Sequence, residues 1–566
     1  AGMDTKVINR SVWGEANCFP DLPLIRRVFT RELSEKSYGN AVGIGLADMV
    51  TDRLVESVNW ATTRINSITA NSITAIREWR SETGQDSDFT AADLVYRPAD
   101  GRNFVQFNQF SQELRLAGEG FDGRLNWLVG VFYTAEDMQF NNELLLGNQF
   151  QQYFSRLINP ADPNVITNLT GNPNAFQGGT GMRDVFQQDT ETWAVFTNNT
   201  LRLTDRLSAT LGASFTDQSK ELDTQYMNTN GGVGCQALRN QFNLIASSPN
   251  LRAAIPTIYG IGCTTLTDPL FNNVSTTQTR DEQEWSGTAK LAFSISDDMM
   301  SYVSYARGYK SGGFNLERER LNGNLANSPL LGPLNGVDPD TSFGRELVDS
   351  YELGLKTQWA GDSLLLNSAV FYQDYENFQL NTFTGLQFIV TSLPQVVSQG
   401  IDVDMLWYTP LRQLTLQGGL TYAETTIEDF GNALALFRPE RQDDTLSFAP
   451  EISATMLATF EQPIGNHLFR SSLAAKYTSD YNTGSNLDPR KIQDAYTLLN
   501  ARIGFGNKSE SWMLELWAQN LTDEEYFQVA FDAALQGSSI GPMPTSMIDA
   551  FLGAPRTYGV TARFKF

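Results

Sequence analysis

The sequence predicts an all-β protein, an antiparallel up-and-down β-barrel that spans a membrane. Segments of about ten residues with alternating apolar and polar side chains recur along the chain. The connections between them alternate between short and long. No stretch approaches the ~18 apolar residues that a transmembrane helix needs, which excludes a helical membrane protein.

The last ten residues, Thr557 to Phe566, alternate without an error. The apolar file of this segment consists of Tyr558, Val560, Ala562, Phe564 and Phe566. From Tyr558 to Phe566 the strand advances roughly 26 Å, or about 20 Å along the membrane normal at ~40° tilt. This distance is close to the height of the apolar band of an outer-membrane barrel. We therefore expect the apolar file to face lipid, with the aromatic ends at the two interfaces.

The connections between the predicted strands favour a barrel over a soluble sandwich. Roughly 17 strands are visible, and short turns such as SDD (296–298) and AGD (360–362) join some of them. Long connections are predicted at 138–188, 221–283, 311–346, 427–448, 480–494 and 522–555. Because long and short connections alternate, all long loops lie at one end, as in barrels with short periplasmic turns and long extracellular loops.

The composition excludes several function classes. Lys and Arg total 41 against 64 Asp and Glu, a net charge of -23, which argues against nucleic acid or an anionic membrane surface as the partner of the whole chain. The lone histidine, His467, has no nucleophile motif beside it. Asp402 and Asp404 share a strand face and could pair as acid and base, but such pairs are common on a wet barrel wall. We expect no enzyme, no metal site and no cofactor.

The three cysteines indicate one candidate disulfide. Cys235 and Cys263 lie in the same long loop, which is rich in Gly, Asn and Thr, so a disulfide in an oxidising compartment is expected. The alternative is two unpaired buried thiols. Cys18 has no obvious partner. The N-terminal AGMDTKVINR lacks the apolar core of a secretory signal, so we expect either a mature or a truncated sequence.

Several segments together carry a pattern of aromatic, glycine and charged residues that can be compared with known families. They are SQELRLAG (111–118), RLSATLGASFTD (206–217), YVSYARGYKSGGFN (302–315), DSYELGLKTQW (349–359), NLTDEEYF (520–527) and the terminal aromatic strand. Together and in this order they resemble the barrel of a TonB-dependent outer-membrane receptor, over at least residues 100–566. The resemblance implies a barrel of about 22 strands with an N-terminal plug in its lumen, preceded by a motif that binds the TonB protein.

The chain departs from that family pattern at its N-terminus. Residues 1–60 show only fragmentary alternation and are assigned as an irregular segment or partial barrel, whereas 61–566 are assigned to the barrel. No plug and no TonB-contacting motif is recognisable. Three explanations are open: the chain is a C-terminal portion, the plug belongs to another chain, or the N-terminal segment takes an unusual fold. We favour the first, which would leave the partner edge of the last strand unpaired.

The resemblance implies TonB-dependent import of a scarce, large ligand across the outer membrane of a Gram-negative bacterium. The ligand could be a ferric siderophore, a cobalamin-like molecule, an oligosaccharide or an aromatic compound. Expected partners are TonB, outer-membrane lipid and this small molecule, but no nucleic acid. Two alternatives stay open. A passive substrate-selective porin would fit ~17 strands without a plug, and a surface barrel could bind a partner protein through its loops.

Two groups of side chains are candidates for function. Tyr305, Arg307 and Tyr309 are predicted on the lumen side near the mouth, where they could bind an anionic or aromatic ligand. The alternative is that Arg307 pairs with a carboxylate of a neighbouring strand. The predicted lumen charges, which would contact the plug or form cross-strand pairs, are Arg563, Lys565, Glu352 and Lys356.

Overall fold

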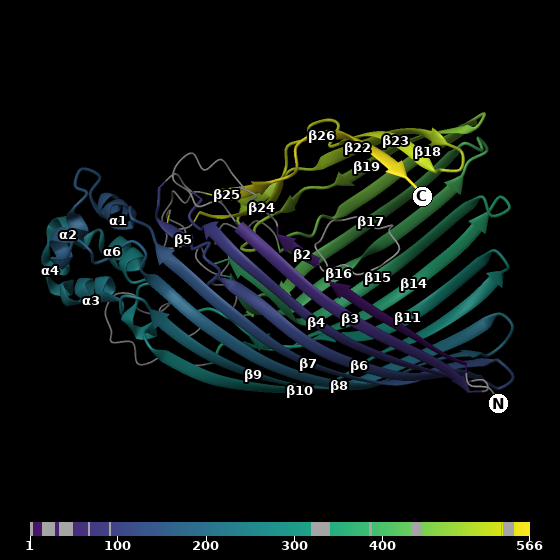
Figure 1. Cartoon of the computed structure of the whole chain (residues 1–566), viewed down its shortest axis with the longest axis horizontal. Helices are drawn as coiled ribbons and strands as arrows, with labels where there is room; N and C mark the ends of the chain where they lie inside the picture. Colours follow the sequence, from purple (N-terminus) through teal and green to yellow (C-terminus); the bar gives the residue numbers. More distant parts are fainter. Residues whose placement is uncertain are drawn as a thin grey trace.

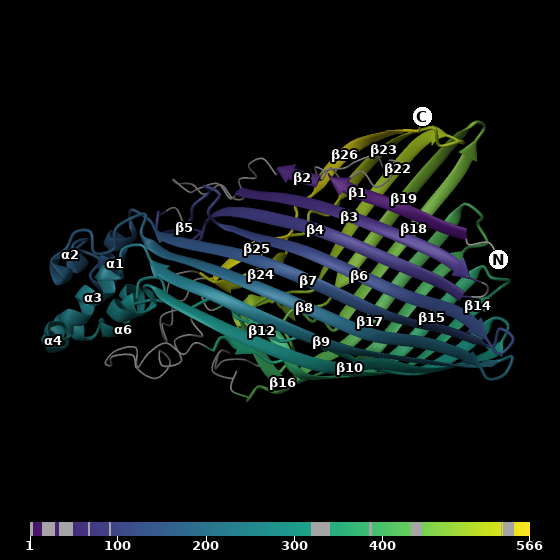
Figure 2. The same ribbon diagram turned by 60° about the horizontal axis from the view of Figure 1, so that its bottom comes forward.

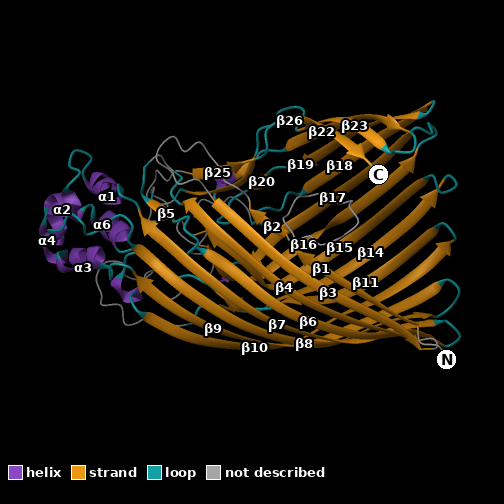
Figure 3. Cartoon of the chain, viewed as in Figure 1, coloured by secondary structure: helices purple, strands orange, loops and turns teal. Residues whose placement is uncertain are grey.

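The chain folds into one large, strongly tilted antiparallel sheet that curves into a barrel, with short helices gathered at one end (Figures 1 and 3). The computed structural model describes residues 4–13, 29–32, 49–65, 68–89, 92–318, 340–383, 388–431, 444–533, 535 and 548–565. Cys18 and Phe566 lie outside these residues. No helix within the described ranges is long and apolar enough to cross a membrane.

The main sheet has 20 strands, and each long strand pairs with the next long strand in the chain. The long strands are β1 (Asp4–Trp13), β3 (Met49–Ile65), β4 (Ile68–Asp86), β6 (Phe104–Gly120), β7 (Leu125–Leu146), β8 (Gly181–Arg202), β9 (Leu207–Asn228), β10 (Val274–Ser296), β11 (Met299–Lys310), β14 (Glu346–Trp359), β15 (Leu364–Phe383), β16 (Phe388–Tyr408), β17 (Leu414–Asp429), β18 (Ile452–Ile464), β19 (His467–Thr478), β22 (Tyr496–Asn507), β23 (Trp512–Gln519) and β26 (Thr557–Phe564). The short strands β2 (Phe29–Glu32) and β5 (Val95–Arg97) pair alongside them. The predicted fold class is confirmed, and the number of long strands is close to the ~17 expected.

Smaller elements lie in the long connections. Three separate strand pairs are β12 (Gly313–Phe314) with β13 (Ser342–Phe343), β20 (Tyr481–Asn482) with β21 (Ile492–Gln493), and β24 (Phe527–Asp532) with β25 (Ile548–Leu552). The helices are α1 (Phe150–Ile158), α2 (Val165–Thr170), α3 (Val233–Asn240), α4 (Phe242–Ser247), α5 (Pro249–Arg252), α6 (Ile255–Gly262) and the 3₁₀ turns η1 (Pro269–Phe271) and η3 (Pro489–Lys491).

Short and long connections lie at opposite ends of the barrel, as predicted (Figure 2). The strands, however, extend further than the sequence indicated: β7 continues to Leu146 and β8 starts at Gly181, inside the predicted loop 138–188. Beyond the membrane the outer face of a strand also meets water. The outward side chains Gln187, Asp189 and Glu191 are exposed there, so the apolar alternation that marks a strand is lost.

The strand register identifies the two faces of the wall. Trp193 and Trp285 are 44% and 63% exposed and flank Phe215, with ring centroids 5.6 Å and 5.1 Å apart. Their alternates Thr192 and Glu284 are buried among polar groups on the opposite face. The aromatic face is therefore the outer, lipid-facing one, and the polar face lines the lumen.

An aromatic row runs around the outer face. Its members on neighbouring strands are Phe110, Tyr133, Trp193, Phe215, Trp285, Tyr305, Tyr351 and Tyr372, most of them in ring contact with the next. On β14 the outward residues between Tyr351 and Trp359 span roughly 20 Å along the membrane normal at ~40° tilt. This height matches the apolar band of an outer-membrane barrel, so Tyr351 and Trp359 lie at its two interfaces.

The last strand has the predicted orientation. Tyr558, Val560 and Phe564 are 80%, 63% and 64% exposed, and Ala562 lies opposite the outward Leu514 of β23. The C-terminus lies at the short-turn end (Figure 1). Within the described residues β26 pairs with β23, and its other edge has no partner strand.

The assignment of the two faces predicts opposite results for one substitution. Leu291 lies on the outward face of β10, about midway between Trp285 of the aromatic row and the end of the strand at Ser296. Leu291→Lys therefore places a charge in lipid and should lower the free energy of unfolding by about 2 to 4 kcal/mol. The control Ser304→Lys places the same charge on the lumen wall, with Glu352 opposite on β14 and Lys290 opposite on β10. Because the attraction and the repulsion offset each other in the wet lumen, it should change this free energy by under ~1 kcal/mol. Urea unfolding from lipid vesicles measures both. Equal losses would contradict the assignment.

Candidate functional site

A cavity of about 700 Å³ opens at the long-loop end of the barrel, and we call it the vestibule. Residues of β4, β7, β15 and β16 line it together with residues of several long loops. Eight of the lining residues are phenylalanines: Phe89, Phe140, Phe378, Phe383, Phe388, Phe448, Phe531 and Phe551. An apolar cavity of this size is typical of a binding site for a small organic molecule.

Five of these residues form a phenylalanine cluster: Phe89, Phe383, Phe388, Phe531 and Phe551. Phe531 of β24 lies at its centre, with ring centroids 5.4 Å from Phe89, 5.6 Å from Phe383 and 5.4 Å from Phe551. Phe383 also contacts Phe388 across the β15–β16 hairpin, at 4.9 Å. The cluster therefore joins three segments that are distant in sequence. Offset and edge-to-face ring packing of this kind stabilises their meeting point.

The vestibule has few charged groups. Its described charged lining residues are Arg97 and Glu317. The Arg97 guanidinium donates a hydrogen bond to the Asn142 amide oxygen, and burial lowers the pKa of Arg97 to about 10, so it stays protonated at neutral pH. The amides of Gln85 and Asn381 add groups that can donate and accept hydrogen bonds. The described lining therefore carries one basic and one acidic side chain.

Helices α1 to α6 form a helical cap over one side of the mouth (Figure 1). The cap has its own hydrophobic core, in which Phe154 and Leu238 are fully buried. Cys235 and Cys263 form a disulfide within it, with Cα atoms 4.8 Å apart. The Tyr153 hydroxyl donates to the Leu535 carbonyl, 2.9 Å away, so the cap contacts the chain just after β24, the strand that carries Phe531.

A buried ion pair anchors the connection between β11 and β14 beneath this cap. Arg318 is fully buried and donates two hydrogen bonds to the Asp184 carboxylate of β8, at 2.8 Å and 2.5 Å. The same guanidinium donates to the Asn228 side chain and to the carbonyls of Met227 and Thr265. All five donors of the arginine are therefore used, and the segment that contains Arg318 is held against β8, β9 and the cap.

A second buried carboxyl shapes the rim beside Phe89. The Asp88 carboxylate is buried and accepts hydrogen bonds from the amides of Leu94 and Val95, at 3.1 Å and 2.9 Å. These bonds close the turn that follows β4. Burial and the nearby Asp88 charge raise the pKa of Asp86 to about 6. The charge of Asp86, at the edge of the vestibule, therefore changes as the pH passes through about 6.

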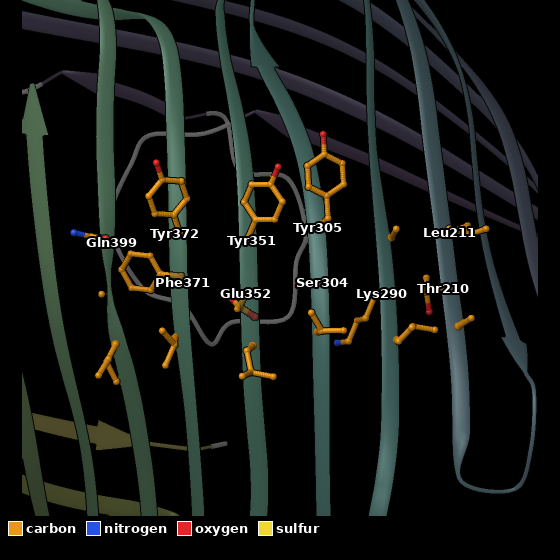
Figure 4. Close-up of a pocket in the computed structure, with 18 of the residues that line it drawn as sticks. Thr210, Leu211, Lys290, Ser304, Tyr305, Tyr351, Glu352, Phe371, Tyr372 and Gln399 are labelled. Atoms are coloured by element: carbon orange, nitrogen blue, oxygen red, sulfur yellow. The ribbon is translucent and has the colours of Figure 1, made fainter. Parts of the chain in front are cut away.

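The lumen placement predicted for Tyr305, Arg307 and Tyr309 is wrong. The register sets Tyr305 opposite Ala289 and Tyr351, on the outward face, and Figure 4 shows it beside Tyr351 and Tyr372 along a hollow of about 800 Å³. Arg307 pairs with Asp349 of the neighbouring strand at 2.8 Å, which was the alternative prediction. Tyrosine is amphipathic and suits the membrane interface as well as the lumen. The other face of this strand carries Ser304, Ala306 and Gly308, which also suit either side. The sequence of the strand alone therefore does not show which face points to lipid.

The predicted lumen charges lie on the inner wall. The Tyr302 hydroxyl donates to Glu352 at 2.5 Å, and the ammonium groups of Lys290 and Lys356 lie 4.1 Å and 6.0 Å from its ring centroid. Figure 4 shows Glu352 and Lys290 on nearby strands below the tyrosine row. These contacts are the predicted cross-strand pairs.

Near the short-turn end, Glu515 accepts from Arg502 and Arg563, at 3.3 Å and 3.0 Å. Lys565 lies 3.5 Å from Glu510 and is largely exposed. Contact of these groups with a plug stays a prediction.

Other candidates have structural surroundings. Asp402 accepts from Thr421 and Asp404 from Asn367, on the inner wall. The ring of His467 stacks on Phe505, with centroids 5.1 Å apart, and also contacts Trp512 near the short-turn end. No group of three His, Cys, Asp or Glu side chains suited to a metal occurs in the described segments.

Sequence reasoning missed both the phenylalanine cluster and the helical cap. The available signals were weak: phenylalanines flank residues 384–387 and recur in QVAFDAALQ and IDAFL, and FQQYFSRLI has helical spacing of apolar residues. Each pattern also fits an ordinary loop. Only the curvature of the sheet brings the three phenylalanine-bearing segments together.

Breaking the buried pair should loosen the mouth of the barrel. Arg318→Met leaves Asp184 buried without its partner, and the free energy that holds this segment should fall by about 3 to 5 kcal/mol. The control Arg307→Met removes the exposed pair with Asp349 and should cost under ~1 kcal/mol. Hydrogen exchange of the amides at 311–318 reports the change. Unchanged exchange in Arg318→Met would contradict the anchoring role.

The raised pKa of Asp86 predicts pH-dependent opening of the rim turn. Because the folded-state pKa of about 6 exceeds the ordinary value of 3.8, the folded turn keeps a proton that the unfolded turn releases. The stabilisation is therefore complete below pH ~4 and is lost as the pH rises through 6. Exchange of the Leu94 and Val95 amides, corrected for intrinsic rates, should increase over this range. Asp86→Asn should abolish the dependence, whereas Asp100→Asn should retain it; identical profiles in both variants would refute the assignment.

Comparison with solved structures agrees with the barrel architecture. The ferric yersiniabactin uptake receptor FyuA from Yersinia pestis is 15% identical, with a TM-score of 0.64 over 92% of this chain and 62% of the receptor. The siderophore receptor PiuA from Acinetobacter baumannii is 14% identical, with a TM-score of 0.59 over 92% of this chain and 65% of that one. The ferric-catecholate import receptor Fiu from E. coli is 15% identical, with a TM-score of 0.57 over 91% and 64%.

These matches show a shared fold, and the chain spans less than two thirds of the length of each of these receptors. A family profile gives the assignment independently. The family described as TonB dependent receptor-like, beta-barrel, matches residues 31–521. The match covers most of the described strands, and the chain therefore belongs to the TonB-dependent receptor family.

Proposed function

We propose that this barrel imports a scarce organic ligand across the outer membrane of a Gram-negative bacterium, with energy supplied through TonB. The observation that carries the proposal is the vestibule, a cavity of about 700 Å³ enclosed by loops at one mouth of the barrel. Its position lets a ligand arrive from outside and enter the lumen below. The outer aromatic row and the closing strand would contact lipid.

The structure of the mouth favours selective capture over passive diffusion. A porin passes polar solutes through a wet constriction, whereas the vestibule is lined by phenylalanine rings. The cap core, the Cys235–Cys263 disulfide and the Arg318–Asp184 pair hold the helical cap and residues 311–318 in one arrangement. A preorganised apolar cavity binds a ligand with less loss of entropy than mobile loops would.

A family-type plug would lie below the vestibule, against the lumen wall. The inner-wall charges Glu352, Lys356, Arg563 and Lys565 would then supply its salt-bridge partners, as the family resemblance implies. TonB would pull on such a plug and open the path to the periplasm. The ligand classes open to the proposal are ferric siderophores, cobalamin-like molecules, oligosaccharides and aromatic compounds.

Depletion of the growth medium tests the import function whatever the ligand is. Untargeted mass spectrometry follows the concentration of each component of the medium over time. Cells that produce the protein should deplete at least one component faster than a deletion strain does. Deletion of TonB should abolish the difference, because the transport is energised. Depletion that persists without TonB would instead indicate a porin. No depletion in any strain would indicate a surface-binding role.

A further inference from the structure

The vestibule exposes the faces of its aromatic rings. Phe388, Phe448, Phe551 and Phe89 are 62%, 47%, 45% and 37% exposed. Large apolar side chains exposed next to one another mark a binding surface more often than an ordinary part of a protein surface. Here they converge on one cavity from the turn after β4, the β15–β16 hairpin, the β24–β25 pair and the segment before β18.

These phenylalanines are too far from the membrane to face lipid. On β15 the chain runs eleven residues from Tyr372, in the outer aromatic row, to Phe383. At ~3.3 Å per residue and ~40° tilt, Phe383 lies roughly 28 Å above that row along the barrel axis. Hydrophobic contact with lipid therefore cannot account for the exposed rings.

The charge of the cavity limits the ligand. Among the described lining residues Arg97 is the one cation, and Glu317 provides an opposite charge. A polyanionic chelate would need several cationic or charge-assisted donors once it is removed from water. The amides of Gln85 and Asn381 instead suit hydroxyl or carbonyl groups.

We infer that the vestibule binds an uncharged or weakly charged aromatic compound, whose rings pack among Phe388, Phe551 and Phe531 and whose polar groups meet the amides of the lining. The inference rests on the proposed function, since it specifies the ligand class of the same site. It distinguishes this barrel from the receptors of similar fold that are named for ferric yersiniabactin and for siderophores. The size of the cavity fits one drug-sized molecule.

Direct binding tests the ligand class. The full chain in lipid nanodiscs is dialysed against three uncharged aromatic probes (4-methylumbelliferyl glucoside, coniferyl alcohol and naringenin), against the trianionic ferric tris-catecholate complex, and against maltotriose. Empty nanodiscs provide the blank for partition into lipid. We expect saturable binding of at least one uncharged aromatic probe and none of maltotriose. Binding of ferric tris-catecholate alone, or of no aromatic probe at millimolar concentration, would overturn the inference.

Two exposed rings allow substitution with little risk to folding. Phe388→Ala and Phe551→Ala should each weaken binding of the aromatic probe by about tenfold, because a stacking face is lost. Phe121→Ala is the matched control, since this ring is 73% exposed in a short turn at the opposite end, and it should leave affinity unchanged. Equal affinity in all three variants would place the bound probe outside the vestibule and overturn the inference.

The two proposals fail separately. If the aromatic probes bind but no TonB-dependent depletion occurs, the ligand class stands and the import function is wrong. If depletion is TonB-dependent but the depleted component is a polyanionic chelate, the import function stands and the ligand class is wrong.

Discussion

Hydrogen bonding between neighbouring strands is the constraint on which the rest of the structure depends. In the hydrocarbon region an unpaired backbone amide or carbonyl costs several kcal/mol, so strands there are stable only where they pair with their neighbours. The β8–β9 pair does so from Met182 opposite Asn228 to Arg202 opposite Ser208. This pairing fixes which side chains face lipid. It also leaves the lumen wall free for polar groups such as Glu352, Lys356 and Glu515.

Above the membrane, different interactions determine the structure. There the loops meet water and need a core of their own, which the helical cap provides around Phe154 and Leu238. The Arg318–Asp184 pair lies beneath it, where both side chains are fully buried. A buried pair of this kind adds little net stability compared with apolar packing, but an arrangement that separates it leaves a buried charge without a partner, which costs about 3 to 5 kcal/mol. The pair therefore holds residues 311–318 in one position against β8, β9 and the cap.

The sequence predicts the features that every strand repeats and misses the features that depend on a single contact between distant segments. Alternation over some seventeen strands reveals the barrel, its direction and the lipid-facing side of the last strand, because every strand carries the same signal. The inward and outward faces of a single strand such as β11 can be assigned the wrong way round, because Tyr305 and Ser304 both suit either face. The register, which places Ala289 and Tyr351 beside Tyr305, decides between them. The phenylalanine cluster has no local signal, since its rings come from three distant segments that meet only in the curved sheet.

The free-energy cost of exposing a phenylalanine differs between the lipid-facing part of the barrel and the long-loop end above it. A phenylalanine on the outer face, such as Phe564, is exposed to lipid, and its exposure carries no hydrophobic cost there. Phe388 and Phe551, with 62% and 45% of their surface exposed, are in contact with water. This contact costs a free energy of about 25 cal/mol for each Å² of exposed apolar surface. A fold that already buries Phe154 and Phe186 completely could have buried these rings as well. Their exposure toward one cavity is therefore best explained by a partner that covers them, and a ligand with aromatic rings would remove this cost.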